Sequence, residues 1–470
     1  EDGSAPASRW LALVAVLGAW VPYVFAALEN SAGGTASLKI GQVALTMDGL
    51  GLLLAGLSLA LGTLVVLYSL RYMAHDEGEE KYYAMLVAMI GVMIGLGCAT
   101  DLFNLWVWFE AMAVTSYLLV AFYKNQSLAL EAGVKYLVQS ATGSMLVVIG
   151  IALVLMQTGT LNLAEIRAAA TPSAGLVVAG ALMVIGFGVK AALVPMHTWL
   201  PDAHSQAPTG ISAMLSGVVI EAGLIAMLRA LGALVTISTA WGVLLMAFGA
   251  INMLVGNLMA LRQQEVKRML AYSSLTHVGY MLLGLGIGIS TGVATGLEGG
   301  MFHMVNHGVM KGLAFLAAGV LLWMLHLVGS DHDTLLVSDL SGAWRRYPIV
   351  AVTLSIAVLG LAGLPPFAGF MSKWQIFVAG FQTGDGLIMA TVVFAALMSV
   401  LSLGYYAPLV NALYRKIPSD VVAHGQPVPL TLQAPLAVMS LVVLAVGLWP
   451  SLLHWLTEPA ARALMAAFGG

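Results

Sequence analysis

The sequence predicts an all-α polytopic membrane protein with about thirteen transmembrane helices. The chain has 470 residues, of which 60% are hydrophobic and only 9% are charged. Soluble proteins carry about 25% charged residues. A soluble protein also could not bury so many apolar side chains, because many residues of a folded chain must lie at the surface in contact with water. The third observation is that the apolar residues fall into long runs separated by short polar segments.

The apolar runs define the predicted spans in order. A helix needs about 20 apolar residues to cross a bilayer. Runs bounded by charges, Gly or Pro lie at 10–28, 48–70, 82–100, 102–122, 132–156, 175–195, 208–231, 240–261, 268–289, 298–325, 347–381, 387–414 and 433–456. The polar segments between them are short, so we expect loops and no large soluble domain. One of them, Leu161–Ala170, could form a short interfacial helix.

Two of the runs contain helix breakers. The run at 347–381 is interrupted by Gly363, Pro365 and Pro366, and the run from 175 meets Pro195 and Pro201. We expect each to form a broken helix. Broken helices at membrane depth occur where they line a cavity or are buried in protein.

Basic residues in the loops predict the orientation. With thirteen spans, the loops on one side receive four basic residues, Lys39, Arg167, Arg229 and Arg462. The loops on the other side receive eleven: Arg9, Arg71, Lys81, Lys124, Arg262, Lys267, Arg268, Arg345, Arg346, Arg415 and Lys416. The richer side faces the cytoplasm by the positive-inside rule. Residue 1 is then cytoplasmic and the C-terminus is outside. The remaining basic residues, Lys135, Lys190, Lys311 and Lys373, fall within spans.

Composition also limits the chemistry. The net charge is −3 without a basic patch, so we expect no nucleic acid partner. The one cysteine, Cys98, excludes a Cys-ligated iron–sulfur cluster within the chain, and we expect no cofactor and no metal. Gly284, Gly286 and Gly288 lie in an apolar run, where we expect them to serve helix packing and not phosphate binding.

Ionisable residues inside the spans are the candidate site. Each costs about 2.5–3.5 kcal/mol at the bilayer centre on insertion scales, so each is a functional hypothesis. His303, His307 and Lys311 are spaced by four residues and therefore share one helix face, which His277 of the preceding span could join. Imidazoles titrate near neutral pH, which favours a proton relay over a metal site or purely structural packing. The other candidates are Glu110, Lys135, Lys190, Glu221 and Lys373.

Structural alternatives apply to several of these residues. Glu110 and Lys190 could form a buried ion pair between two helices, or a switchable pair in which Glu110 controls the proton on Lys190. Lys135 and Glu131 are four residues apart near a helix end, so a structural role is as plausible as a relay role. The link PMHTWLPDAHSQAP contains His197, Asp202 and His204, where helix capping and conduction stay open.

Long motifs resemble one known family. They are ATDLFNLWVWFEAM, VKAALVPMHTWLPDAHSQAPTGISAMLSG, VKRMLAYSSLTHVGYM, MFHMVNHGVMKGLAFLAAG and GLPPFAGFMSKW. They resemble the antiporter-like subunits of respiratory complex I, Mrp-type Na⁺/H⁺ antiporters and membrane-bound hydrogenases, over about residues 48–415. The first and last motifs look closest to the Mrp D-type and hydrogenase-type branch.

The resemblance implies a fold and roles for residues. The family has fourteen helices, with two inverted five-helix repeats that each contain a broken helix. Here the repeats would be 82–231 and 240–414, preceded by N-terminal helices in 1–81 and followed by a loop and last helix in 415–470. Glu110 and Lys190 match its fifth-helix glutamate and seventh-helix lysine, and Lys373 matches its twelfth-helix lysine or glutamate. His303, His307 and Lys311 match the polar face of its eleventh helix.

Two departures from the family pattern stand out. This chain has thirteen predicted spans and the family has fourteen helices, and matching the motifs places the first predicted span at the family's second helix. We therefore expect the family's first helix to be absent from this chain. The chain also begins with Glu1 and not Met. Many members also carry a lysine in the eighth helix, where this chain has Glu221. A relay through this position would therefore pass through a carboxylate.

The resulting hypothesis is a proton-translocating subunit of a multisubunit membrane complex, with Na⁺ as a possible second ion. Its partners would be other integral membrane subunits, including related antiporter-like ones, and lipid. It lacks its own redox site, so whether it belongs to an enzyme depends on those neighbours. The alternatives are a stand-alone cation/proton transporter, a structural scaffold, or a subunit that couples H⁺ flow to CO₂ or bicarbonate uptake.

Overall fold

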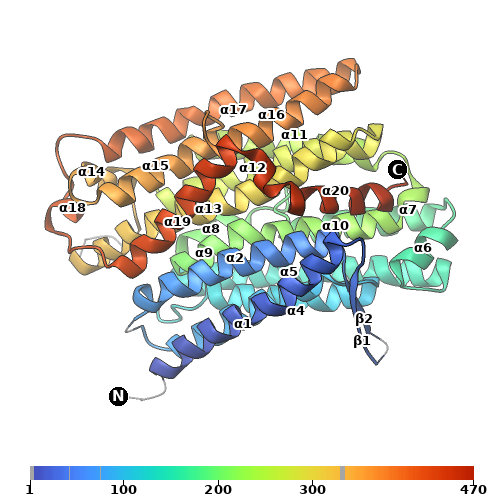
Figure 1. The fold of residues 1–470 in the computed structure, drawn as a ribbon, viewed down its shortest axis with the longest axis horizontal. Coiled ribbons are helices and arrows are strands. Elements are labelled where there is room, and N and C mark those ends of the chain that lie inside the picture. The colour runs from blue at the N-terminus through green and yellow to red at the C-terminus, as the bar shows by residue number, and fades with distance from the viewer. Residues whose placement is uncertain (1–4, 42, 75, 329–333, 470) are drawn as a thin grey trace.

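Long helices run side by side along the long axis of the molecule (Figure 1). The computed structural model describes residues 5–41, 43–74, 76–328 and 334–469. Among these residues, eleven helices are long and apolar enough to cross a membrane, and two shorter apolar helices, Ala174–Lys190 and Pro348–Ala362, accompany them. This confirms the predicted all-α membrane fold.

The first half of the chain contains ten helices and one small hairpin among the described residues. The helices are α1 (Ala5–Ser31), α2 (Gly49–Tyr72), α3 (Glu79–Gly97), α4 (Leu102–Val120), α5 (Ser127–Thr158), α6 (Leu163–Ala169), α7 (Ala174–Lys190), α8 (Trp199–Gln206), α9 (Thr209–Met214) and α10 (Ile220–Ala233). A π-helical turn, Leu215–Val219, joins α9 to α10. Strands β1 (Ala36–Ile40) and β2 (Val43–Met47) pair antiparallel, in a segment predicted to be a loop.

The second half contains ten further helices in the described part of the chain. They are α11 (Trp241–Ala260), α12 (Val266–Thr291), α13 (Ala294–Val328), α14 (Ala343–Arg346), α15 (Pro348–Ala362), α16 (Ala368–Gln382), α17 (Gly386–Leu413), α18 (Asp420–His424), α19 (Leu430–Leu448) and α20 (His454–Ala467). Short 3₁₀ turns lie at Val235–Ile237, Val337–Leu340 and Pro450–Leu453.

Local sequence explains where several helices begin. The carboxylate of Asp48 accepts a hydrogen bond from the Gly51 amide at the start of α2, and Asp101 does the same for Asn104 in α4. Ser173 caps α7 and Asp385 caps α17 in the same way. Such caps satisfy amides that have no partner inside the helix. The predicted interfacial helix forms as α6, which Asn162 caps.

Both predicted helix breaks are present. The helix α7 ends at Lys190, and an irregular link that contains Pro195 precedes α8. The second break follows α15, where Gly363 has φ +83°, and the helix resumes as α16 after Pro365 and Pro366. The backbone freedom of Gly363 and the missing amide protons of proline explain both stops.

The last predicted span has different bounds in the structure. The sequence predicts a single helix at 433–456, but α19 ends at Leu448 and a 3₁₀ turn starting at Pro450 leads into α20. Proline restricts the residue before it to extended backbone, which favours a stop there. The helix α20 then continues to Ala467 and buries Leu456, Ala460 and Leu464 against the bundle.

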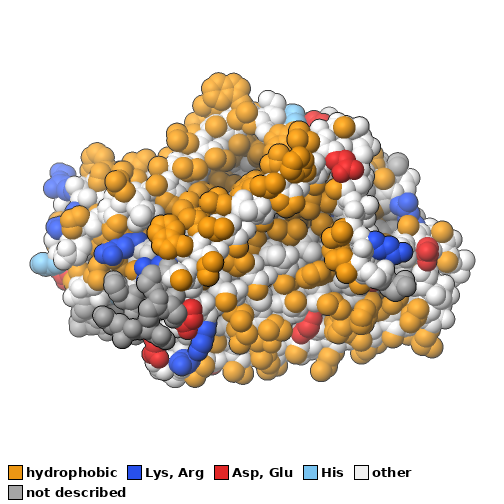
Figure 2. Space-filling view, turned by 60° about the horizontal axis from the view of Figure 1, so that its bottom comes forward, with side chains coloured by type: hydrophobic (Ala, Val, Ile, Leu, Met, Phe, Trp, Pro, Cys, Tyr) orange, Lys and Arg blue, Asp and Glu red, His pale blue; other side chains and the backbone are white. Residues whose placement is uncertain are grey.

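The helices differ in how far they are buried. Nearly all of α12 and α13 lies inside the bundle, whereas α1 and α17 expose most of their apolar surface. Figure 2 shows a face covered by hydrophobic side chains, with the few charged ones mostly toward the two ends. That pattern fits a bundle surrounded by lipid or by other apolar subunits.

The loops gather at two opposite ends of the bundle. One end holds α14 and α18 and the other holds the β1–β2 hairpin and α6, while α1 begins and α20 ends at opposite ends (Figure 1). Arg345 and Arg346 lie on α14 and Arg415 follows α17 at the same end. We call this end the basic end.

Candidate functional site

The ammonium group of Lys190 is enclosed at the first helix break. Lys190 is the last residue of α7 and is fully buried. It donates to the Tyr136 hydroxyl (2.8 Å) and the Ser140 hydroxyl (3.1 Å), both on α5. It also lies 4.0 Å from the centroid of the Tyr136 ring, which stacks on Trp199. Hydroxyl groups and aromatic faces therefore solvate this amine.

The carboxylate of Glu110 does not pair directly with Lys190 among the described residues. Glu110 is half-buried on α4, and its Oε2 is buried without a hydrogen-bond partner. Its neighbour Phe109 packs edge-to-face on Phe187 of α7, with ring centroids 5.0 Å apart, one turn before Lys190. The helices α4 and α7 therefore touch beside these two residues, but the direct ion pair is not formed.

The first break is held by a side chain from the second half of the chain. The buried Asn252 of α11 donates to the Ala192 carbonyl (3.0 Å) and accepts from the Val194 amide (2.9 Å). Ala192 has φ +53°, which L-residues rarely adopt. Backbone groups released at a break inside a membrane need such partners. Asn252 therefore fixes the geometry beside Lys190.

Glu221 forms a buried pair with His307. Glu221 Oε1 lies 2.9 Å from His307 Nδ1, and both side chains have no exposed surface. Glu221 Oε2 and His307 Nε2 are buried without partners in the described protein, so each can take part in a further proton transfer. Glu221 lies two residues after the π-helical turn Leu215–Val219. Such turns often occur at functional sites.

Two imidazoles continue from this pair. The ring of His277 lies 5.3 Å from that of His307, and His277 Nδ1 lies 3.1 Å from His303 Nε2. His303 Nδ1 in turn lies 2.8 Å from the Ser372 hydroxyl on α16. A hydrogen bond between two imidazoles requires one nitrogen to donate and the other to accept, which is the arrangement needed for proton transfer. His277 joins the His303–His307 face, as its place in the preceding span suggested.

Lys373 lies at the second break. It is the last member of a buried row of side chains, which consists of Lys190, Glu221, His307, His277, His303, Ser372 and Lys373. Its ammonium donates to the carbonyls of Leu361 (2.9 Å) and Ala362 (3.3 Å), which end α15, and to the Ser399 hydroxyl (2.9 Å). The C-terminal end of a helix is its negative pole and favours a cation. Lys373 follows Ser372 directly and lies 4.5 Å from the centroid of the Tyr280 ring. Tyr280 also touches the ring of His303.

Lys311 lies farther along the same face of α13. It is fully buried, donates to the Leu270 carbonyl (2.7 Å) and contacts the Ser273 hydroxyl, both on α12. Ser274, on the same turn, shares a hydrogen bond of 2.7 Å with Ser216 in the π-helical turn. The lysine therefore joins α12 and α13 next to the histidines.

Lys135 lies apart from this row. Its side chain is 49% exposed and bridges Glu131 (2.7 Å) and Asp202 (2.9 Å). Asp202 also binds Arg268 at 2.8 Å. This cluster ties α5, α8 and α12 together, which favours the structural alternative for Lys135.

Neutral and less conspicuous residues complete the site. The site also contains Tyr136, Ser140, Tyr280, Ser372 and Ser399, which contact its lysines and histidines and are not among the residues predicted from sequence. The four-residue spacing of Tyr136 and Ser140 was an available signal for the first two. Lys267, counted among the loop charges, is buried instead at 3% exposure.

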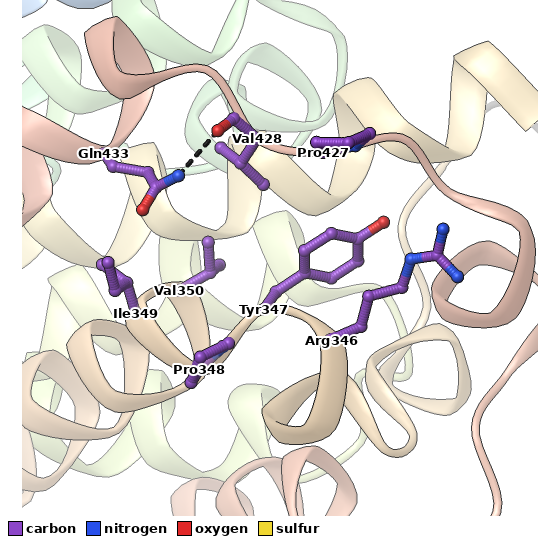
Figure 3. Close-up of a pocket in the computed structure, with 8 residues that line it drawn as sticks. All are labelled: Arg346, Tyr347, Pro348, Ile349, Val350, Pro427, Val428 and Gln433. Atoms are coloured by element: carbon purple, nitrogen blue, oxygen red, sulfur yellow. Dashed lines mark hydrogen bonds between the residues drawn. The ribbon is translucent and has the colours of Figure 1, made fainter.

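A surface cavity at the basic end is separate from this row. It has a volume of about 330 Å³ and lies between the start of α15 and the segment before α19 (Figure 3). Arg346 and Tyr347 line one side, and Gln433 donates to the Val428 carbonyl on the other. It contains none of the predicted site residues.

Comparison with known proteins places the chain in a family. A sequence model described as "NADH:quinone oxidoreductase/Mrp antiporter, TM" matches residues 99–399. The chain belongs to this family. A second model, "NADH-Ubiquinone oxidoreductase (complex I), chain 5 N-terminus", matches residues 36–83. The first match includes every predicted site residue from Glu110 to Lys373.

Curated members of the family align over most of their length. The F(420)H(2) dehydrogenase subunit N of Methanosarcina mazei is 33% identical over 92% of this chain and 87% of that protein. The NADH-quinone oxidoreductase subunit N of Deinococcus radiodurans is 34% identical over 90% of this chain and 84% of that protein. Hydrogenase-4 component B of Escherichia coli is 33% identical over 73% and 52%. The predicted family is confirmed, and the branch within it stays a prediction.

Solved structures of similar chains come from multisubunit membrane complexes. A chain of the membrane-bound sulfane sulfur reductase, an archaeal respiratory complex, is 28% identical with a TM-score of 0.87, covering 100% of this chain and 94% of that one. A chain of respiratory complex I from Thermus thermophilus is 28% identical with a TM-score of 0.77, covering 97% and 95%. A chain of the Mrp complex from Dietzia has the same fold at 22% identity and a TM-score of 0.86, covering 99% and 95%. The chain is thus an antiporter-like membrane subunit.

Proposed function

We propose that this subunit moves protons across the membrane within a multisubunit ion-pumping complex, along the buried row from Lys190 through Glu221 and the histidines to Lys373. The observation that supports this most is the continuity of the second half of the row. Glu221, His307, His277, His303 and Ser372 follow one another through hydrogen bonds of 2.8–3.1 Å and one ring contact of 5.3 Å.

Glu110 has a gating role in this proposal. A negative charge on Glu110 favours the protonated form of Lys190, and neutralising Glu110 would favour release of the proton toward Glu221. The helices that carry Lys190 and Glu221 touch at Gly223, where an added Cβ would lie 2.8 Å from Lys190 Cβ. A buried bridging water could complete such a transfer, since buried polar atoms bind water.

The energy would come from neighbouring subunits. The one cysteine, Cys98, is buried, and we propose that the chain holds no cofactor of its own. The similar solved chains named above come from a sulfane sulfur reductase, an Mrp complex and respiratory complex I, which fits an ion-moving subunit beside other membrane subunits.

The test compares lysine variants in the purified complex. The complex would be isolated through a tag on this chain, reconstituted into liposomes and driven by an imposed pH gradient and potential, so that no electron donor need be known. We expect Lys190→Ala to lower the initial proton flux at least tenfold, whereas Lys124→Ala, an exposed loop lysine, leaves it unchanged. Unchanged flux in Lys190→Ala would overturn the proposal.

We also propose that the basic end faces the cytoplasm. Positive residues are retained on the cytoplasmic side during insertion. In a Cys98→Ala background, a membrane-impermeant thiol reagent applied to intact cells should label Ser37→Cys in the β1–β2 hairpin and spare Lys124→Cys. The reverse labelling pattern would overturn this orientation.

A further inference from the structure

A polar cavity opens at the basic end, away from the cavity of Figure 3. It has a volume of about 420 Å³ and lies among the ends of α2 and α8, the link before α5 and the start of α12. Asn125, Gln126, Ser205 and Lys267 are among its lining residues. On its wall, Tyr123 donates to Asp76 at 3.0 Å, and burial raises the pKa of Tyr123 well above its ordinary value, so the phenol stays protonated. The cavity is therefore lined by polar groups up to a buried lysine.

Lys267 lies at the inner wall of this cavity. It is only 3% exposed, and its ammonium donates to the Ala207 carbonyl (2.6 Å) and the Ser205 carbonyl (3.3 Å) at the end of α8. In the described part of the chain, it is held by backbone carbonyls and by no carboxylate. A lysine held in this way can lose its proton without leaving a buried anion unpaired.

His204 lies between Lys267 and the buried row. It is fully buried, and neither of its ring nitrogens has a hydrogen-bond partner in the described protein. Its ring stacks on Phe315 of α13 with centroids 4.7 Å apart, one turn beyond Lys311. The charges of both Lys267 and Lys311 are near enough to act on His204. Buried imidazole nitrogens without partners are rare and need an explanation.

One face of α12 also connects Lys267 with Lys311 and the histidines. Lys267, Leu270, Ser274 and His277 follow one another at intervals of three and four residues and so share one face. The Leu270 carbonyl is the group that accepts from Lys311. This face therefore leads from the cavity to Lys311 and then to the histidines.

We propose that Lys267 and His204 form the route by which Lys311 exchanges protons with the polar cavity at the basic end. This rests on the proposed function and adds a route to its buried row. The ammonium of Lys267 gives a proton to one ring nitrogen of His204, and the other ring nitrogen gives one to the neutral amine of Lys311. Lys267 then regains a proton from water in the cavity, so one proton moves inward and no other bond changes.

Blocking the cavity tests the route. In a Cys98→Ala background, Asn125→Cys places a thiol at the lining, and Gln264→Cys places one in the exposed loop before α12 at the same end. After reaction with a sulfonated methanethiosulfonate, we expect the proton flux of the reconstituted complex to fall at least tenfold in Asn125→Cys and to recover on reduction. Labelled Gln264→Cys should stay within twofold of the unlabelled complex. Equal flux in both labelled variants would overturn the route.

Substitutions separate proton transfer from packing. Lys267→Arg keeps a cation to hold the α8 carbonyls but cannot release a proton, and His204→Phe keeps the stacking on Phe315 without ring nitrogens. We expect each assembled variant to lose at least tenfold in flux. Full flux in both variants would overturn the route. If the unsubstituted complex itself moved no protons, the proposed function would fail instead, which distinguishes the two claims.

Discussion

Ser372 connects two groups that the chain supplies from separate helices. Its hydroxyl binds His303 and its backbone neighbour is Lys373, so it joins the histidines of α12 and α13 to the second helix break. Serine hydroxyls both donate and accept, which allows a proton to pass in either direction. It is therefore a positioning and transfer residue of the proposed row.

Removing this hydroxyl should slow proton transfer. Removing one partner of a buried hydrogen bond leaves the other unsatisfied and costs about 1–3 kcal/mol. An increase of about 1.4 kcal/mol in the barrier to proton transfer slows it tenfold. We expect Ser372→Ala to lower the flux of the reconstituted complex about tenfold. Ser290→Ala is the control, because within the described residues the Ser290 hydroxyl bonds carbonyls of its own helix alone, at Gly286 and Ile287. Equal flux in the two variants would contradict the role of Ser372.

Lys135 should behave differently from Lys190. It is half-exposed and belongs to the cluster with Glu131 and Asp202, outside the buried row. We expect Lys135→Ala to assemble normally and to keep the proton flux within about twofold. The same liposome measurement decides this, and a loss as large as that of Lys190→Ala would place Lys135 in the row after all.

The charged residues of the candidate site could be predicted from the sequence. An ionisable group in an apolar run is conspicuous because burial is costly, which is why Lys190, Glu221 and Lys373 could be found. Tyr136 and Ser372 are ordinary in apolar helices, and only their three-dimensional contacts mark them. Lys267 was assigned to a loop because it stands beside Arg268 at a span edge, and sequence position does not show that α8 folds over it.

Helix packing depends on glycines at close contacts. The three glycines of α12 lie against its neighbours: Gly286 faces α11, and Gly284 and Gly288 face α13. A Cβ on Gly286 would lie 2.6 Å from the Gly242 carbonyl oxygen. This confirms the packing role expected for the three glycines.

Enlarging Gly286 should loosen the bundle. Forcing a methyl group against backbone atoms costs about 1–3 kcal/mol. We expect Gly286→Ala to lower the thermal unfolding midpoint of the detergent-solubilised complex. Gly91→Ala in α3 is the matched control, because nothing lies within 4 Å of its added Cβ, and it should not lower the midpoint. A midpoint for Gly286→Ala equal to that of Gly91→Ala would contradict the packing.

Helix breaks were predictable where proline and glycine coincide with a long apolar run. The stops after Lys190 and at Gly363 follow from local backbone chemistry. The groups that satisfy those breaks lie on other helices: Asn252 on α11 for the first, and Lys373 on α16 with Ser399 on α17 for the second. The β1–β2 hairpin was missed because its two strands have only five residues each and none of these residues is buried.

At the scale of the bundle, the two broken helices fall one in each predicted repeat. The first lies within 82–231 and the second within 240–414. The inverted relation of the repeats stays a prediction. Glu221 on α10 and His307 on α13 join the two segments, so the buried row passes from one to the other at this pair. Its loss would separate Lys190 from the histidines.

The most direct measurement is therefore the proton flux of Glu221→Gln in the reconstituted complex. The amide keeps the size of the side chain but cannot carry the proton. Glu298→Gln is the control, because Glu298 is a half-buried carboxylate on α13 that contacts Gln375 outside the row. We predict at least a tenfold loss of flux in Glu221→Gln and none in Glu298→Gln. Full flux in Glu221→Gln would contradict the proposal that protons cross the membrane through this row.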